Sequence, residues 1–291
     1  MKAARTELLL PFVLVSFAAN SLITRHVVQQ NLLDAGLLTG VRFIAGAVAL
    51  LVLTFALRER PTVGRANLLP ALWLGVYAVC ISYGYQHIGA AAGTFVFYAT
   101  VLVTLVAFDL ARRVAVPSRR LVGAGIALVG LAVLASRSVS TVTPLGVALL
   151  AATGAAWGLY TAAGRTDADP RVATTGHFAV LAAVLLVPSG VLLGTARVTG
   201  VGLAWGIVMG AGTTAFAYVA WYVCQRTLSA TSAGTVQLAI PVITAAGAVV
   251  LLGEHVTTRL AVAAVLVAAG MWVARARAVA PSPTRSAGLT E

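Results

Sequence analysis

The hydrophobic residues form long runs, and the short segments between them hold most of the charged residues. A helix needs about 20 apolar residues to cross roughly 30 Å of hydrocarbon. The runs therefore predict an all-α membrane protein with ten transmembrane helices. These lie at about 8–25, 35–57, 68–86, 89–109, 119–136, 144–163, 173–193, 200–224, 230–252 and 258–274.

The sequence repeats itself at an offset of 141 residues, which places Ala92-Gly93-Thr94 on Ala233-Gly234-Thr235 and Thr100 on Pro241. Five spans per copy is an odd number, so the second copy enters the membrane in the opposite orientation. We therefore predict two inverted five-helix repeats followed by a disordered cytoplasmic tail, because the last residues are polar and include proline and serine. The three units are 1–140, 141–279 and 280–291.

The composition agrees with a membrane protein, since 60% of the residues are hydrophobic and only 10% are charged. The net charge of +12 would suggest nucleic acid in a soluble protein, but here the arginines lie between apolar runs, so no nucleic-acid partner is expected. With the N-terminus inside, fifteen Lys and Arg residues lie on the cytoplasmic side, four lie outside, and Arg42 lies within a span. This asymmetry predicts a multi-pass protein of the cytoplasmic membrane with both termini cytoplasmic.

The stretch from Ser229 to Glu254 carries unusual residues for a spanning helix, because Gly234, Gln237 and Pro241 share one face. A buried amide needs a partner in lipid, so Gln237 either bridges two helices or contacts a substrate. Pro241 removes one helical hydrogen bond and crowds the carbonyl of Gln237, so the helix should bend or loosen there. The bend is either a hinge or a static kink.

Three features of the sequence resemble the drug/metabolite transporter superfamily, specifically its EamA-like members. They are the segment SAGTVQLAIPVITAAGAVVLLGE, Trp157-Gly158 in the sixth span and Arg42-Phe43 in the second, and the likeness covers about 8–275. The first half departs from the pattern, with Asn20-Ser21 where Trp-Gly is usual and Thr100 where Pro is usual. The resemblance implies export or exchange of a small organic metabolite through a central cavity lined by both halves.

Two basic residues occupy matching positions inside the spans. Arg42 lies roughly 12 Å deep, at about 1.5 Å per residue, and its charge is costly there unless it faces a cavity or a partner. It is a candidate contact for an anion or carboxylate, or else a member of a structural ion pair. Aligning Arg42-Phe43 with His177-Phe178 makes His177 a candidate for proton coupling, or else a hydrogen-bonded packing residue.

Aromatic and polar residues complete the predicted binding cavity, because amphipathic rings can hold an apolar or cationic body while their polar tips fix its orientation. Such a cavity suits an amino acid, an analogue, or an aromatic or drug-like compound. The predicted cavity residues are Asn20, Arg42, Tyr83, Thr94, Tyr98, Trp157, Tyr160, Tyr218 and Gln237.

Competing functions differ in the motifs they require. An ATP-driven pump is excluded within this chain, because there is no G-x-x-x-x-G-K-[ST] and the only lysine is Lys2. Neither H-E-x-x-H nor G-x-S-x-G occurs, so we expect no enzyme activity, no metal and no cofactor. The leading hypothesis is a secondary transporter working by alternating access, and the alternatives are a non-coupled channel or facilitator and an intramembrane enzyme. The expected partners are then the solute and the lipid bilayer, and the sequence leaves open whether the protein forms a homo-oligomer.

Overall fold

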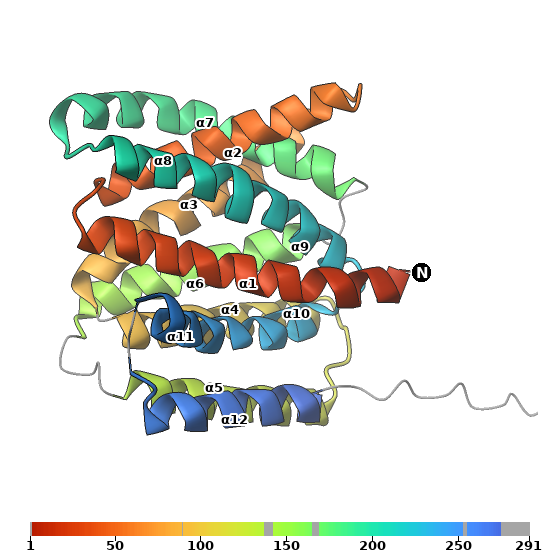
Figure 1. Ribbon diagram of the computed structural model, residues 1–291. Helices are drawn as coiled ribbons and strands as arrows, with labels where there is room; N and C mark the ends of the chain where they lie inside the picture. The colour runs from red at the N-terminus through yellow and green to blue at the C-terminus, as the bar shows by residue number, and fades with distance from the viewer. Residues whose placement is uncertain (1, 89, 137–141, 165–168, 253–254, 275–291) are drawn as a thin grey trace, which may run out of the picture.

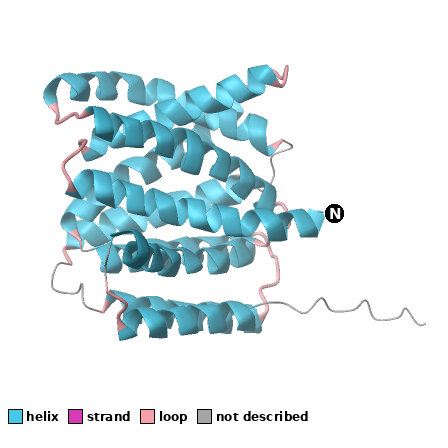
Figure 2. Cartoon of the chain, in the orientation of Figure 1, coloured by secondary structure: helices cyan, strands magenta, loops and turns pink. Residues whose placement is uncertain are grey.

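The computed structural model describes residues 2–88, 90–136, 142–164, 169–252 and 255–274. Within these ranges every regular element is a helix (Figure 2), apart from an isolated bridge between Leu33 and Val198. The helices run roughly along one direction and lie side by side, as expected for a membrane bundle (Figure 1). The predicted tail, 280–291, lies outside the described residues.

Ten spans account for the helices of the described chain, and the predicted all-α fold is confirmed. Nine are long and apolar enough to cross a membrane, and the tenth, Thr258–Ala274, is a shorter apolar helix. Two spans are subdivided: α8, η2 and α9 follow one another without a break, and α10 and α11 share a span. The first half holds α1 (Lys2–Gln29), α2 (Ala35–Ala56), α3 (Arg65–His87), α4 (Ala90–Ala111) and α5 (Ser118–Ala135). The second holds α6 (Pro144–Ala163), α7 (Pro170–Thr195), α8 (Gly200–Val208), η2 (Met209–Phe216), α9 (Ala217–Gln225), α10 (Ala230–Gln237), α11 (Ala239–Leu252) and α12 (Thr258–Ala274).

Short polar side chains begin many of these helices. Asp34 accepts hydrogen bonds from the first free amides of α2, and Asp169 does the same for α7. Thr143, Thr199 and Ser229 cap α6, α8 and α10 in the same way. Such caps satisfy amides that have no partner within the helix. The sequence therefore marks where each of these spans starts.

The two halves interdigitate, so most of the packing joins one half to the other. α5 packs against α12, α2 against α7, and both α3 and α4 against α6. The backbones of α5 and α12 approach closely at Gly123 and Gly270, where an added Cβ on either would meet the carbonyl oxygen of the other. α1 packs on α9 and α11 as α6 packs on α3 and α4. This exchange of partners is consistent with the predicted repeat, and Figure 1 shows α1 and α6 starting from opposite ends of the bundle.

At one end of the bundle, the segment after α1 pairs with the segment after α7 through backbone atoms. The amide of Asp34 donates to the carbonyl of Arg197 (3.1 Å), and the amide of Thr199 donates to the carbonyl of Leu32 (3.1 Å). The bridge between Leu33 and Val198 lies between these bonds. We call residues 32–34 with 197–199 the backbone junction.

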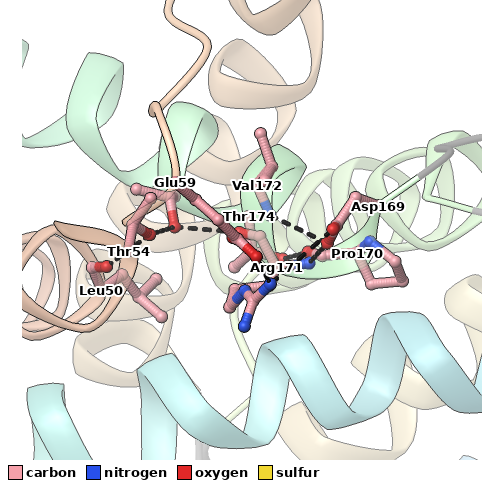
Figure 3. A network of polar contacts seen from close by, with 9 residues as sticks. Leu50, Thr54, Glu59, Asp169, Pro170, Arg171, Val172 and Thr174 are labelled. Atoms are coloured by element: carbon pink, nitrogen blue, oxygen red, sulfur yellow. Dashed lines mark hydrogen bonds and ion pairs between the residues drawn. The ribbon is translucent and has the colours of Figure 1, made fainter. Parts of the chain in front are cut away.

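At the opposite end, the halves meet through side chains (Figure 3). Glu59, in the loop after α2, forms an ion pair with Arg171 in the first turn of α7. Asp169 lies 3.8 Å from the same guanidinium, and the hydroxyls of Thr54 and Thr175 are 3.2 Å apart one turn deeper. We call these five residues the ion-pair junction.

Candidate functional site

Aromatic side chains from both halves meet in the interior of the bundle. Trp157 of α6 lies at their centre, with ring centroids 5.1 Å from Tyr77, 5.1 Å from Tyr218 and 5.6 Å from Tyr160. Such spacings are those of favourable aromatic pairs. We define the central aromatic cluster as Phe17, Phe43, Tyr77, Phe97, Tyr98, Trp157, Tyr160, Phe178 and Tyr218.

A hydrogen bond ties the cluster to the last third of the chain. The indole nitrogen of Trp157 donates to the side-chain oxygen of Gln237 (2.5 Å), and the Gln237 amide nitrogen donates to the carbonyl of Ala233 (3.1 Å). Both Trp157 and Gln237 are buried. Of the two interpretations left open by the sequence, the structure shows the bridge between two helices. A solute that bonds Gln237 must replace Trp157 or share it.

The helical path is interrupted beside Gln237, where α10 ends and α11 begins. Leu238 lies between them, and its amide donates to Thr235, three residues back, at 3.2 Å. Pro241 follows in the first turn of α11 and cannot donate. The predicted loosening of this span is therefore confirmed. Whether it serves as a hinge remains a proposal.

Arg42 is a buried cation held among rings. Its guanidinium lies 4.5 Å from the ring centre of Phe43 and 5.9 Å from that of Tyr77, and the residue is 6% exposed. Nε and Nη2 are buried and find no hydrogen-bond acceptor among the described residues. The ring faces offset part of the cost of burying the charge, but they do not satisfy N–H donors.

His177 occupies the matching place on α7. Phe43 and Phe178, the residues that follow Arg42 and His177, contact each other where α2 crosses α7, with centroids 5.3 Å apart. The His177 ring lies 5.7 Å from Tyr160 and is 2% exposed. Its Nδ1 has no partner in the described part of the chain. Each half thus contributes one basic side chain with unpaired nitrogen to the neighbourhood of the cluster.

The other predicted cavity residues lie in three different situations. Tyr98 is buried beside Phe97, with centroids 4.4 Å apart, at the α4 edge of the cluster. Thr94 is hydrogen-bonded to the hydroxyl of Tyr85 at 3.0 Å, and Tyr83 is 48% exposed on α3. The structure therefore brings together Arg42, Tyr98, Trp157, Tyr160, His177, Tyr218 and Gln237, and it leaves Thr94 and Tyr83 outside the cluster.

Asn20 is engaged with a π-helix. Its Nδ2 donates to the carbonyl of Thr213 (2.9 Å), and its Oδ1 accepts from the hydroxyls of Thr213 (2.7 Å) and Thr214 (3.1 Å). Both threonines belong to η2, whose wide turns adjoin α2: a Cβ on Gly210 would meet the carbonyl oxygen of Arg42. Asn20 thus hydrogen-bonds to η2, and η2 packs against the turn of α2 that carries Arg42.

Sequence reasoning missed one structural carboxylate. Asp109 looks interfacial from its place at the end of an apolar run, yet it is 1% exposed. It accepts hydrogen bonds from the amide (2.8 Å) and the hydroxyl (2.8 Å) of Thr231 and from the amide of Ala230 (3.3 Å). A carboxylate is favoured at a helix N-terminus, so Asp109 anchors α10 to α4.

Two grooves lie apart from this site, along α4 and α5. They measure about 230 and 400 Å³ and are lined almost entirely by apolar side chains such as Val96, Leu102 and Leu128. Neither shares a residue with Arg42, His177 or Trp157. Neither groove therefore offers the polar groups that would orient a polar solute.

Comparisons with known proteins identify a matching family model, a sequence relative and a structural relative of this chain. A model of the EamA-like transporter family matches residues 144–276. The uncharacterized protein PA1977 of Pseudomonas aeruginosa is 35% identical over 275 residues, which are 93% of this chain and 94% of that protein. A protein of known crystal structure shares the fold, with a TM-score of 0.78 over 92% of this chain and 96% of its own at 19% identity.

Proposed function

The chain belongs to the EamA-like transporter family of the drug/metabolite transporter superfamily, and on that premise we propose that it is a secondary transporter. It moves a small organic metabolite across the cytoplasmic membrane by alternating access, as an exporter or an exchanger. The solute binds at the central aromatic cluster, between the two halves.

The observation that carries this proposal is the burial of unpaired polar groups inside an apolar layer. Ionisable side chains within membrane spans are expensive and mark solute or ion pathways. Arg42 and His177 are of this kind, and they reach the same cluster from opposite halves. A site between two repeats near mid-membrane is where alternating access requires the solute to bind.

The two junctions support the same mechanism. The backbone junction and the ion-pair junction join the halves at opposite ends of the bundle, and both are formed here. Alternating access then consists of opening one junction at a time around the cluster. The break at Leu238 gives the span of α10 and α11 a place to bend during this change.

The test is solute counterflow. Vesicles containing the purified protein are loaded with an isotope-labelled bacterial small-molecule extract, and efflux of the label is followed by mass spectrometry with and without the unlabelled extract outside. A transporter gives saturable efflux of particular solutes that external extract accelerates. A channel gives efflux that external solute does not accelerate, an enzyme gives no flux, and protein-free vesicles set the baseline.

Proton coupling through His177 is the finer part of the proposal. The side chain is buried and its Nδ1 is unpaired within the described chain. Coupling requires that a pH gradient drive accumulation in wild-type vesicles and fail to do so in His177→Gln. Equal accumulation in both would assign His177 to packing beside Tyr160.

A further inference from the structure

The chemical class of the solute can be inferred from Arg42, on the premise that the proposed function holds. The donors without partners in the described chain are Nε and Nη2. These two N–H groups lie along one edge of the planar guanidinium and point the same way. That edge matches the two oxygens of a carboxylate, which it binds through two parallel hydrogen bonds.

Among the residues that the structure describes, none supplies a carboxylate to Arg42. The acidic side chains in the described part of the chain lie near helix ends or in loops: Glu7, Asp34, Glu59, Asp109 and Asp169. Asp109 binds the start of α10, and Glu59 and Asp169 face Arg171. A buried cation without a counter-charge is strongly unfavourable. An anion from outside the chain therefore completes the site.

The same inventory argues against a second, positive group on the solute. An ammonium beside the anion would lie near Arg42 with no carboxylate to receive it. The guanidinium already lies over a face of Phe43 and of Tyr77, and Trp157 packs against Tyr77, Tyr160 and Tyr218. The body of the solute meets ring edges and apolar surface.

We propose that Arg42 binds the carboxylate of the transported solute through Nε and Nη2, and that the solute is an organic monocarboxylate with a flat apolar body and no ammonium group. His177, on the facing helix, offers its unpaired Nδ1 to a further polar atom of the solute. A zwitterionic amino acid of the same shape is a poorer ligand than the simple acid.

Three probes of one skeleton separate the charges. 3-Phenylpropanoate carries the carboxylate alone, L-phenylalanine carries both groups, and 2-phenylethylamine carries the ammonium alone. Thermal unfolding of the purified protein reports binding, because a ligand of the folded state stabilises it by an amount that grows with its concentration over Kd. We expect stabilisation in the order 3-phenylpropanoate, L-phenylalanine, 2-phenylethylamine. Equal or stronger stabilisation by the amine, or none by the simple acid, overturns the assignment.

Arg42→Gln tests the residue, with Arg259→Gln, an exposed arginine at the start of α12, as the matched control. We expect Arg42→Gln to weaken 3-phenylpropanoate binding by about 100-fold, the order expected for losing a bidentate charged pair. Without ligand it should melt at or above the wild-type temperature, because it removes an unpaired buried charge. A structural ion pair would give the opposite result, with lower stability and unchanged ligand stabilisation.

Flux in vesicles keeps this inference separate from the function on which it rests. If 3-phenylpropanoate binds through Arg42 but is never carried across the membrane, the binding assignment stands and the transport mechanism falls. If L-phenylalanine or the amine is carried equally well by wild type and Arg42→Gln, transport stands and the carboxylate assignment is wrong.

Discussion

The hydrogen bond from Trp157 to Gln237 is a buried polar contact with both partners in place, whereas Nε and Nη2 of Arg42 have no partner among the described residues. Removing one partner of a buried pair costs more than removing both, because the remaining group loses water without gaining a substitute. A substitution of Trp157 alone should therefore destabilise the protein more than substitution of both Trp157 and Gln237.

We expect Trp157→Phe to lower the free energy of unfolding by about 1–3 kcal/mol, because the side-chain oxygen of Gln237 is left unpaired. The matched control is Trp272→Phe, since Trp272 is 66% exposed on α12. Adding Gln237→Leu to Trp157→Phe should restore part of the loss. Titration with a denaturing detergent measures the free energy of unfolding of each variant. Equal stability of Trp157→Phe and Trp272→Phe would show that the hydrogen bond contributes nothing.

Single residues were predictable from the sequence when a local rule applied to them. The burial of Arg42, Trp157 and Gln237 in spans follows from the apolar runs around them. The role of Asp109 does not, because its partner Thr231 lies 122 residues away and no local pattern connects them. The places of Tyr83 and Thr94 outside the cluster were not predictable for the same reason. Residue spacing shows which residues share a helix face, but not which other helix packs against that face.

Among the helices, the ten spans were predictable because each must bury enough apolar length to cross the bilayer. The π-helix η2 was not predictable, because its side-chain partner Asn20, which bonds Thr213 and Thr214, lies about 190 residues earlier. The sequence Gly-Ala-Gly-Thr-Thr at 210–214 is a local trace of it. The break at Leu238 was predictable, because Pro241 acts on its own helix.

Pro241→Ala tests whether this break is a hinge. We expect the turnover number to fall by about tenfold, equivalent to about 1.4 kcal/mol in the barrier, while ligand affinity stays near wild type. The matched control is Pro188→Ala, which lies within the continuous helix α7 on an exposed face. Counterflow rates together with thermal-shift titrations measure the two quantities. Normal turnover in Pro241→Ala at normal expression would assign the kink to packing.

The orientation of the bundle in the membrane is a prediction from charge that chemical labelling can test. The segment at 196–199 and the N-terminus lie at opposite ends of the helices (Figure 1). In a background lacking Cys80 and Cys224, an impermeant thiol reagent should modify Thr195→Cys and Ser138→Cys in intact cells. Ser286→Cys should react only after the membrane is opened. The reverse pattern would invert the predicted topology.

The interdigitation of the halves has a consequence for how the protein is made. The principal partners of α2, α3, α4 and α5 are α7, α6 and α12, none of which has been synthesised when the first half enters the membrane. At about 5–20 residues per second, the first half waits roughly 7–27 s for the last of them, with Arg42 facing lipid or an insertion factor. Residues 1–140 expressed alone should therefore be degraded, and coexpressed 141–291 should rescue both fragments, as immunoblots would show. Stable accumulation of the lone first fragment would mean that its helices find sufficient partners among themselves. If the fragment is degraded, the first five helices need protection in the membrane until the second half has been synthesised.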